Sequence, residues 1–349
     1  MTTPWGYPDF DAHEALHFVT DEATGLRAII AVHSTHLGPA AGGTRFWHYA
    51  NESDALTDAL RLSRGMSYKN AMAGLPLGGG KGVILASQER TKSPELLAAF
   101  GRAIDSLGGK YVTAEDVGMS VSDMIEIARQ TKFVAGLPVD TGVGGDPGPH
   151  TSLGVFLGIK AAVKRALGKD SLDGLHIALQ GAGSVAGGVA RHACAEGARL
   201  SVADVDPGRA ESLAQLCNAS VVDPSEIMAL EADVFSPNAL GAILDETTIA
   251  ALNAPIVAGG ANNQLKTPAD GKRLMDRGIL YAPDYVINAG GIINVSTEYL
   301  RDGDVDLVRE RIEGIPGRLE TIWADSASSG RDPAAVADAM AQRLIGRGQ

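Results

Sequence analysis

Residues 177–204 constrain the fold of this chain more than any other segment. The apolar run Ile177–Gln180 is followed by the glycine turn GAGS at 181–184 and then by a stretch of helical composition. A second apolar run, Leu200–Ala203, ends at Asp204, about 20 residues after the turn. A strand, a glycine turn, a helix and a second strand in this order predict a βαβ unit with parallel strands.

The glycine turn also predicts a dinucleotide site. Gly181 permits a tight turn, and Gly183 lets a pyrophosphate approach the amides at the helix N-terminus. A carboxylate at Asp204 can accept hydrogen bonds from both ribose hydroxyls and would repel a 2′-phosphate, which favours NAD over NADP. The alternative for the glycines is a simple tight turn, and the neighbouring acid Asp206 is more typical of a helix N-cap. The predicted cofactor contacts in this unit are Gly181, Gly183, Ser184, Val185 and Asp204.

The composition is typical of a two-domain globular protein. The chain has 349 residues, 45% of them hydrophobic, and a net charge of −12, which disfavours nucleic acid and anionic membranes as partners. No apolar run reaches the roughly 18 residues of a membrane helix, and the N-terminus lacks the pattern of a signal peptide. Cys194 and Cys217 alone cannot form a disulfide framework or a cysteine-rich metal site. We therefore expect a soluble cytoplasmic protein.

The Gly- and Pro-rich stretch Leu137–Pro149 separates two differently patterned halves of the chain. In the first half, two apolar runs around Gly25 predict a hairpin. Short strands are expected there at 83–85 and 111–113, and helices at 52–67, 93–107 and 122–131. In the second half strands and helices alternate, which predicts a parallel sheet covered on both faces.

Two lysines, Lys69 and Lys81, lie among small and apolar residues in the run at 65–82. A lysine withdrawn from water, or placed beside another ammonium, has a lowered pKa and can act as a general base. The other lysine could hold a carboxylate. A phosphate-binding loop is excluded because Gly82 stands where that motif needs Ser or Thr. From the residues alone, the paired-lysine site stays open.

Three further loops carry candidate site residues, each with a structural alternative. The small-residue loop 37–45 fits close contact with a small substrate, or a tight turn. Glu115 and Asp116 follow a short strand, where one could transfer a proton or both could form an N-cap or a surface pair. Asn262 and Asn263 could donate to a carboxylate or carboxamide, or form a turn. The histidines show no metal-ligand spacing, so we expect no metal site.

The chain contains six characteristic blocks: GPAAGGTR at 38–45, MSYKNAMAGLPLGGGKGVI at 66–84, TAEDVG at 113–118, QGAGSVA at 180–186, GGANNQL at 259–265 and YAPDYVINAGGIINV at 281–295. Together and in this order they resemble the Glu/Leu/Phe/Val amino-acid dehydrogenases, most closely the branched-chain and phenylalanine members. Because the blocks extend over most of the chain, the resemblance is specific. It favours the paired-lysine site.

The resemblance implies a fold and a reaction. The expected fold is α/β, with a substrate-binding and oligomerisation domain on a mixed sheet at 1–136 and a Rossmann-type doubly wound NAD domain at 137–324. A cleft would separate the domains, and the C-terminal helix, about 325–349, would pack back onto the first. The implied reaction converts an apolar L-amino acid, NAD and water reversibly into a 2-oxo acid, ammonia and NADH. A homo-oligomer, from dimer to octamer, is expected.

The resemblance also assigns roles to individual residues. Lys69 would hold the substrate carboxylate, Lys81 would activate water, and Asp116 would exchange protons with the amine. The further contacts that it implies are Gly42 and Gly43 to the substrate, Asn262 or Asn263 near the substrate carboxylate and the nicotinamide, and Thr151 to the carboxamide.

The expected side-chain pocket is apolar, formed by Ala41, Ala114, Ile292 and Val295. It offers no cation to glutamate, so a branched-chain substrate is favoured. The small Ala41 would widen the pocket, which keeps phenylalanine as an alternative. Two rival functions fit less well. A catalytically silent NAD sensor would lack one of the lysines or Asp116, and an enzyme acting on free amines would lack Lys69.

Overall fold

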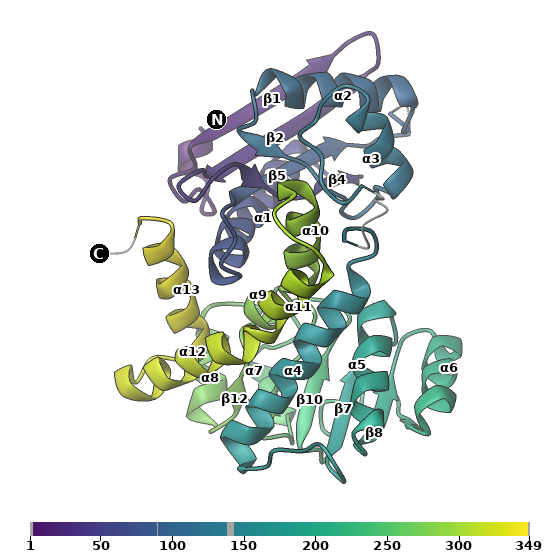
Figure 1. Ribbon diagram of the computed structural model, residues 1–349, viewed down its shortest axis with the longest axis vertical. Coiled ribbons are helices and arrows are strands. Elements are labelled where there is room, and N and C mark those ends of the chain that lie inside the picture. The colour runs from purple at the N-terminus through teal and green to yellow at the C-terminus, as the bar shows by residue number, and fades with distance from the viewer. Residues whose placement is uncertain (1–2, 89, 138–142, 348–349) are drawn as a thin grey trace. The chain divides into compact units, whose positions relative to one another are not determined.

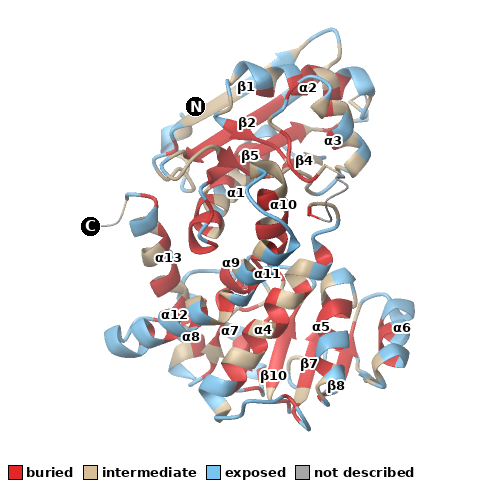
Figure 2. Ribbon diagram, viewed as in Figure 1, coloured by how far each residue is buried: buried red, intermediate tan, exposed pale blue. Residues whose placement is uncertain are grey.

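The computed structural model describes residues 3–88, 90–137 and 143–347. The chain forms two compact units, each with its own sheet and buried core (Figures 1 and 2). Unit 1 comprises Met1–Gly145, Asn294–Val305 and Met340–Gln349, and unit 2 comprises Asp146–Ile293 and Asp306–Ala339. The expected junction at 137–149 lies partly outside the described residues, because 138–142 are not among them.

Unit 1 is built on a mixed six-stranded sheet. Its strands are β1 (Ala15–Asp21), β2 (Leu26–Ser34), β3 (Ala40–Ala41), β4 (Thr44–Trp47), β5 (Gly78–Leu85) and β6 (Tyr111–Val112). They are ordered β1-β2-β5-β3-β6, and β4 also pairs with β5. The β1–β2 and β2–β5 pairs are antiparallel, which confirms the predicted hairpin, and the other pairs are parallel.

Helices cover both faces of this sheet. The 21-residue α1 (Glu52–Met72) packs on β2 and β5, whereas α2 (Pro94–Ser106) and α3 (Val121–Ala128) pack together, with α2 against β1 and β2. Along β2, Ile29 and Ala31 belong to the core under α1, while Ile30 and Val32 belong to the core under α2. Because both faces of β2 are buried, its sequence is a continuous apolar run rather than an alternating one.

Two elements of unit 1 are longer than the sequence predicts. Strand β5 begins at Gly78 rather than at Val83, and α1 continues beyond residue 67, so Lys81 lies in a strand and Lys69 in the last turn of a helix. The glycines permit this extension because they approach neighbouring backbone closely. A Cβ on Gly79 would lie 2.0 Å from the amide nitrogen of Ser67 on α1.

Unit 2 is built on a six-stranded parallel sheet. Its strands are β7 (His176–Gln180), β8 (Arg199–Ala203), β9 (Ser220–Val221), β10 (Val234–Pro237), β11 (Ile256–Val257) and β12 (Leu280–Tyr281). Their order is β12-β11-β10-β7-β8-β9, which is a doubly wound topology. The chain fills the sheet in one direction from β7 to β9 and in the other from β10 to β12. The predicted α/β class, with a mixed sheet first and a parallel sheet second, is confirmed.

The helices of the second half alternate with these strands and continue to the C-terminus. They are α4 (Gly148–Leu167), α5 (Ser184–Ala195), α6 (Pro207–Cys217), α7 (Glu246–Ala251), α8 (Ala269–Asp276), α9 (Asp284–Ile287), α10 (Gly290–Leu300), α11 (Val305–Glu313), α12 (Ile315–Ser329) and α13 (Pro333–Leu344). Asp206 caps α6 by accepting hydrogen bonds from two amides, as predicted. Of the helices in the described residues, none has the length and hydropathy needed to cross a membrane.

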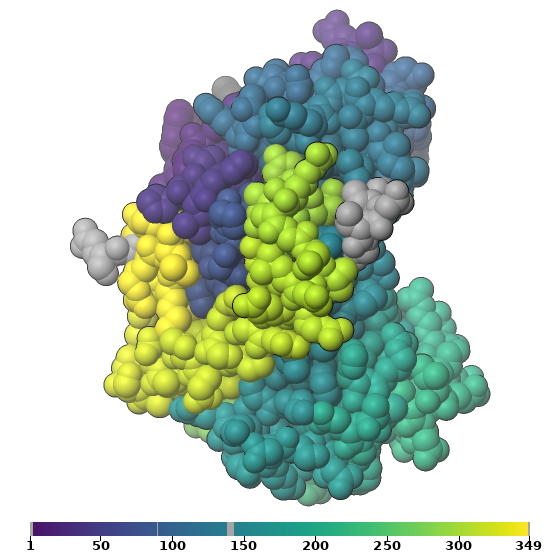
Figure 3. Space-filling model, in the orientation of Figure 1, coloured from purple at the N-terminus to yellow at the C-terminus, as the bar shows by residue number. Residues whose placement is uncertain are grey.

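The last residues of the chain belong to unit 1. The Arg347 guanidinium donates to the backbone oxygens of Asp11, Ala12 and His33 at 2.6, 2.9 and 2.5 Å. Gln342 on α13 donates to the hydroxyl of Tyr68 on α1. Figure 3 shows the yellow C-terminal residues beside the dark blue residues of α1. The two ends of the sequence are therefore joined by hydrogen bonds within unit 1.

Candidate active site

Lys81 on β5 and Asp116, in the segment after β6, form an ion pair in unit 1. Lys81 Nζ lies 2.6 Å from Asp116 Oδ2. The lysine side chain is 6% exposed and the aspartate side chain 23% exposed, so water screens the pair only partly. The tertiary structure thus brings together the two residues that the sequence proposed as catalytic.

Arg45 on β4 is a third member of this cluster. Its Nε donates to the same Asp116 Oδ2 at 3.0 Å, and its Nη1 donates to Asp58 Oδ2 on α1 at 2.7 Å. The Tyr49 hydroxyl donates to that Asp58 oxygen at 2.8 Å. Asp116 therefore accepts from two cations at one oxygen, and the guanidinium of Arg45 is itself held by a second carboxylate.

The cluster shifts the protonation of both catalytic candidates. Burial lowers the pKa of Lys81, and the nearby Arg45 cation acts in the same direction, although Asp116 opposes it. For Asp116, burial alone would raise the pKa, but the charges of Lys81 and Arg45 outweigh it and hold the pKa below its ordinary value. Asp116 therefore stays ionised, while Lys81 loses its proton more readily than an exposed lysine.

The paired glycines of the loop at 37–45 make this arrangement possible. A Cβ on Gly42 would lie 1.9 Å from the carbonyl oxygen of Gly80, and one on Gly43 would lie 2.9 Å from Asp116 Cβ. The buried Tyr111 hydroxyl donates to the Gly42 oxygen at 2.7 Å and fixes the loop. These glycines are therefore required by close backbone packing between β3 and β4 rather than by a turn. Their contact with substrate stays a prediction.

Lys69 is half-buried, and its neighbour Asn70 is hydrogen-bonded to the loop at 37–45 and to β5. The neighbouring Asn70 is fully buried, and its Nδ2 donates to the Gly78 oxygen at 2.5 Å and to the Ala41 oxygen at 3.4 Å. The last turn of α1 is thereby connected to β3 and β5. The residue next to Lys69 is thus hydrogen-bonded to the strand that carries Lys81.

The predicted pocket residues belong to both units. Ala41 is buried, and Ala114 and Val295 are half-buried in unit 1. The half-buried Ile292 belongs to unit 2, because the division between the units falls within α10. All four side chains are apolar, and their common role in a pocket stays a prediction.

The glycine turn of unit 2 has the geometry of an anion site. Gly181 has φ +97°, a conformation that favours glycine, and no atom lies within 4 Å of where a Cβ on Gly183 would be. Helix α5 begins at Ser184 and is preceded by Gly183, so no side chain caps its first amides. A cavity of about 760 Å³ opens beside this turn.

Asp204 lies next to the turn, at the carboxyl end of β8. Its Oδ2 accepts a hydrogen bond from the amide of Ala182 at 2.7 Å, and its Oδ1 accepts from the amide of Asp206 at 2.9 Å. An open helix N-terminus beside an oriented carboxylate is the combination that a pyrophosphate and its ribose require. The residues present therefore fit a dinucleotide.

The two adjacent asparagines of unit 2 differ in their surroundings. Asn288 Nδ2 donates to the Gly260 oxygen at 3.1 Å and to Asn262 Oδ1 at 2.8 Å. Since the carbonyl of Gly260 can only accept, the amide orientation of Asn288 is fixed, and that of Asn262 follows from it. Asn263 has φ +52°, which fits the turn-forming interpretation.

The remaining predicted cofactor contact, Thr151, lies in the first turn of α4. Its hydroxyl donates to the Pro147 oxygen at 2.9 Å. A Cβ on Gly291, at the start of α10, would lie 2.6 Å from this hydroxyl oxygen. The structure thus places the hydroxyl at a helix start, and its contact with a carboxamide stays a prediction.

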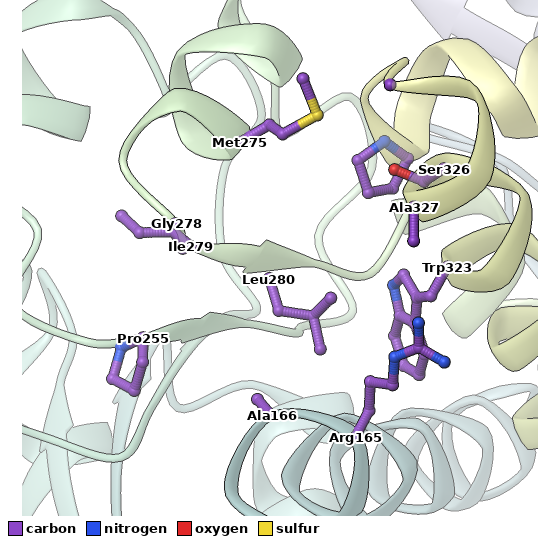
Figure 4. A pocket seen from close by; sticks show the side chains of 12 residues that line it. Arg165, Ala166, Pro255, Met275, Gly278, Ile279, Leu280, Trp323, Ser326 and Ala327 are labelled. Atoms are coloured by element: carbon purple, nitrogen blue, oxygen red, sulfur yellow. The ribbon is translucent and has the colours of Figure 1, made fainter.

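A second cavity in unit 2 does not contain these residues. It measures about 490 Å³ and lies at the amino ends of β11 and β12, with Trp323, Leu280 and Arg165 among its lining side chains (Figure 4). The glycine turn and Asp204 lie at the carboxyl ends of their strands instead.

Within the described ranges, no three His, Cys, Asp or Glu side chains gather closely enough to hold a metal ion.

The sequence did not identify the residues that support the site. These are Arg45, Asp58, Tyr49, Tyr111, Asn70 and Asn288. Only Arg45 carried a signal, because it stands two residues after Gly43 in a loop otherwise built of small residues. The others are buried or half-buried polar residues whose partners lie on other strands, helices or loops.

Comparisons with known proteins show the family of this chain. The model of the Glu/Leu/Phe/Val dehydrogenase dimerisation domain matches residues 13–133, and that of the Glutamate/Leucine/Phenylalanine/Valine dehydrogenases matches residues 208–332. Leucine dehydrogenase of Bacillus subtilis (strain 168) is 47% identical over 96% of this chain and 92% of its own length.

Two further relatives cover nearly the whole chain. Valine dehydrogenase of Streptomyces coelicolor is 45% identical over 97% of this chain and 94% of its own. The crystal structure of L-tryptophan dehydrogenase from Nostoc punctiforme superposes with a TM-score of 0.85 at 44% identity, covering 96% of both chains. The chain belongs to the Glu/Leu/Phe/Val dehydrogenase family.

Proposed function

We propose that this protein is an NAD-dependent dehydrogenase that oxidatively deaminates branched-chain L-amino acids. The observation that carries the proposal is the contact of the buried Lys81 with Asp116, which places a desolvated amine beside an acid–base group. Family membership implies a nicotinamide cofactor. Relatives named leucine and valine dehydrogenase support the branched-chain substrate.

Lys81 is the general base in this proposal. Its neutral Nζ takes a proton from the water that attacks the substrate imine, and its lowered pKa makes this form accessible. Asp116 exchanges protons with the substrate amine, and Lys69 holds the carboxylate by charge-assisted hydrogen bonds. Gly42 and Gly43 line the substrate. The nicotinamide, when bound, accepts the hydride that leaves the substrate Cα.

The cofactor in this proposal is NAD rather than NADP. The amides of the turn and of the first turn of α5 would hold the pyrophosphate, with contacts from Gly181, Gly183, Ser184 and Val185. Asp204 would accept the ribose hydroxyls, and its charge supports the exclusion of a 2′-phosphate. Asn262, oriented by Asn288, would present its amide NH₂ to the carboxamide or substrate carboxylate, and Thr151 would contact the carboxamide. Asn263 is the alternative to Asn262.

The substrate side chain would meet Ala41, Ala114, Ile292 and Val295. An apolar surface of this kind accepts leucine, valine or isoleucine and gives a second carboxylate no partner. An aromatic substrate, phenylalanine or tryptophan, is the second candidate. It is favoured by the small side chain of Ala41 and by the similarity to L-tryptophan dehydrogenase.

The direct test is NADH formation with each of the twenty L-amino acids at alkaline pH. We expect leucine, valine or isoleucine to have the highest kcat/KM. Glutamate should be a very poor substrate, because burying its unpaired carboxylate costs several kcal/mol. Leading activity with phenylalanine or tryptophan would favour the second candidate. Strong activity with glutamate, or none with any apolar amino acid, would overturn the proposal.

We also propose that the protein is a cytoplasmic homo-oligomer, between a dimer and an octamer. The match of residues 13–133 to a dimerisation domain supports self-association. Light scattering coupled to gel filtration measures the assembly, and a single-chain mass at micromolar concentration would contradict it.

A further inference from the structure

We propose that Arg45 is a positioning residue of the reaction site: with Asp58 and Tyr49 behind it, it fixes the Asp116 carboxylate for proton exchange and keeps Lys81 poised as a base. The inference deepens the proposed function and rests on it. Arg45 itself is not assigned a contact with substrate, since its role is exerted through Asp116 and Lys81.

The sheet register places Arg45 on the same face of the sheet as Lys81. In the parallel pair of β4 and β5, Arg45 lies opposite Val83, two residues from Lys81. Residues two apart in a strand share a face, and parallel partners point to the same side. Val83 belongs to the core under α1, so Arg45 and Lys81 also face this helix. The same helix supplies Asp58 as the second anchor of the guanidinium.

The hydrogen bonds fix Asp116 from a defined direction. Both cation contacts, from Lys81 Nζ at 2.6 Å and Arg45 Nε at 3.0 Å, are made to Oδ2. A carboxylate held at one oxygen by two donors from two strands has little freedom to rotate. Without Arg45, this oxygen would lose one of its two cationic donors, and the other, Lys81, must lose its proton during the reaction. The backbone hydrogen bond of Val117 to Asp116 would remain.

The charges around the pair give Arg45 a second effect. The charged groups that act on Lys81 and Asp116 include Arg45 from β4 and Asp58 from α1. The neutral phenol of Tyr111 lies near Asp116, and that of Tyr49 contacts Asp58. The Arg45 cation disfavours a second positive charge on Lys81. Its removal would also leave the Asp58 carboxylate unneutralised, which favours protonated Lys81. Both changes raise the pKa of Lys81 in a variant that lacks Arg45.

A matched surface pair provides the control. Arg61 on α1 faces Asp9 at 3.6 Å, and its side chain is 58% exposed, compared with 22% for Arg45. Exposed ion pairs of this kind contribute little to the stability of a protein. Arg61→Met therefore removes an equivalent charge from the same unit without touching the cluster, and its activity and pH profile should match those of the unchanged protein.

The experiment compares Arg45→Met, Arg45→Lys, Asp58→Asn and Arg61→Met by two readouts. One is kcat/KM for leucine as a function of pH. The other is competitive labelling of Lys81 with trinitrobenzenesulfonate, quantified by peptide mass spectrometry across pH, which needs no substrate. For Arg45→Met we expect kcat to fall roughly tenfold or more, a barrier change of about 1.4 kcal/mol. The acid limb and the labelling midpoint should both move to higher pH.

NADH binding and circular dichroism show whether Arg45→Met folds, and if it does not, Arg45→Lys and Asp58→Asn replace it. Arg45→Lys should restore the midpoint but only part of kcat, because an ammonium cannot contact two carboxylates in a fixed fork. Asp58→Asn should lower kcat while the fold persists. An unchanged Lys81 midpoint and kcat in Arg45→Met, or in Asp58→Asn if the former is unfolded, would overturn the inference. An unmodified protein inactive on all amino acids would instead refute the proposed function, and labelling would still decide the effect of Arg45.

Discussion

At the scale of single residues, the site depends on how its two lysines differ. Burial lowers the pKa of Lys81 below 10.5, so the neutral form of Lys81 becomes populated at a lower pH than in an exposed lysine. The rate of deamination should therefore rise as the pH approaches that pKa.

We expect Lys81→Ala to abolish turnover at every pH while NADH still binds. Lys69→Ala should mainly raise the KM for the amino acid, because one charge-assisted contact of about 1.5–3 kcal/mol is lost. Steady-state kinetics across pH measures both, and near-normal kcat in Lys81→Ala would remove its role as base.

A second residue-scale prediction concerns Asp204. Its carboxylate accepts from two backbone amides and lies where the ribose of a dinucleotide would be held. Asp204→Asn keeps the size of the side chain and removes its charge, so the preference for NAD over NADP should narrow by at least roughly tenfold, or about 1.4 kcal/mol. The ratio of kcat/KM for the two cofactors checks this. If the unchanged protein uses both cofactors equally, Asp204 does not discriminate between them.

At the scale of elements, the packing of α1 on β5 depends on glycine. Gly79→Ala would place a methyl group 2.0 Å from the Ser67 amide nitrogen, and backbone cannot yield as a flexible side chain can. We expect a destabilisation of about 1–3 kcal/mol or more, and reduced activity because Lys69 and Lys81 lie on these two elements. Gly65→Ala on the exposed side of α1 meets no atom within 4 Å and should instead stabilise by about 0.5–1 kcal/mol. Thermal unfolding of Gly79→Ala and Gly65→Ala measures both effects. Equal changes in Tm for the two variants would contradict the close packing of α1 on β5.

At the scale of the whole molecule, the C-terminus holds the first unit through a buried histidine. Burial, together with the Arg347 cation, lowers the pKa of His33 from 6.5 to about 3. Between these values the unfolded chain binds a proton that the folded chain does not, so stability should fall as the pH drops from 6.5 towards 3. His33 Nε2 lies 2.7 Å from Arg347 Nη1 and 3.1 Å from Asp11 Oδ2, and Nδ1 lies 2.7 Å from the Ser67 hydroxyl.

The hydrogen bonds of Arg347 predict the effect of replacing it. Arg347→Met should lower the stability of β2 at pH 7 by about 1.5–3 kcal/mol, because several hydrogen bonds from a charged group are lost. It should also weaken the acid sensitivity, since the pKa of His33 rises without the neighbouring cation. Hydrogen exchange of β2 amides at pH 7 and 5 measures both effects, and the exposed Arg343→Met, in the last turn of α13, is the control. An acid response identical to that of the unchanged protein would contradict the role of Arg347.

Much of unit 2 could be predicted from the sequence because its signals are local. The apolar run of β8, the cap at Asp206 and the tight turn at Gly181 depend on hydrophobic periodicity, on hydrogen bonds between near neighbours and on a backbone conformation that favours glycine. Ser93 likewise caps α2 by accepting a hydrogen bond from the amide of Leu96, three residues later. In such segments the residues that decide the structure are also adjacent in the chain.

The tertiary structure decided what depends on distant partners. The glycines at 78–80 have little intrinsic preference for a strand, and they form one only because the bare backbone fits against β2 and α1. Arg45 and Asp116 meet across 71 positions of sequence, and Asn288 orients Asn262 across 26. The sequence by itself determined which residue types carry the chemistry. Only the packed sheet determined which oxygen of Asp116 receives two cations, because strand register and burial are properties of the assembled fold.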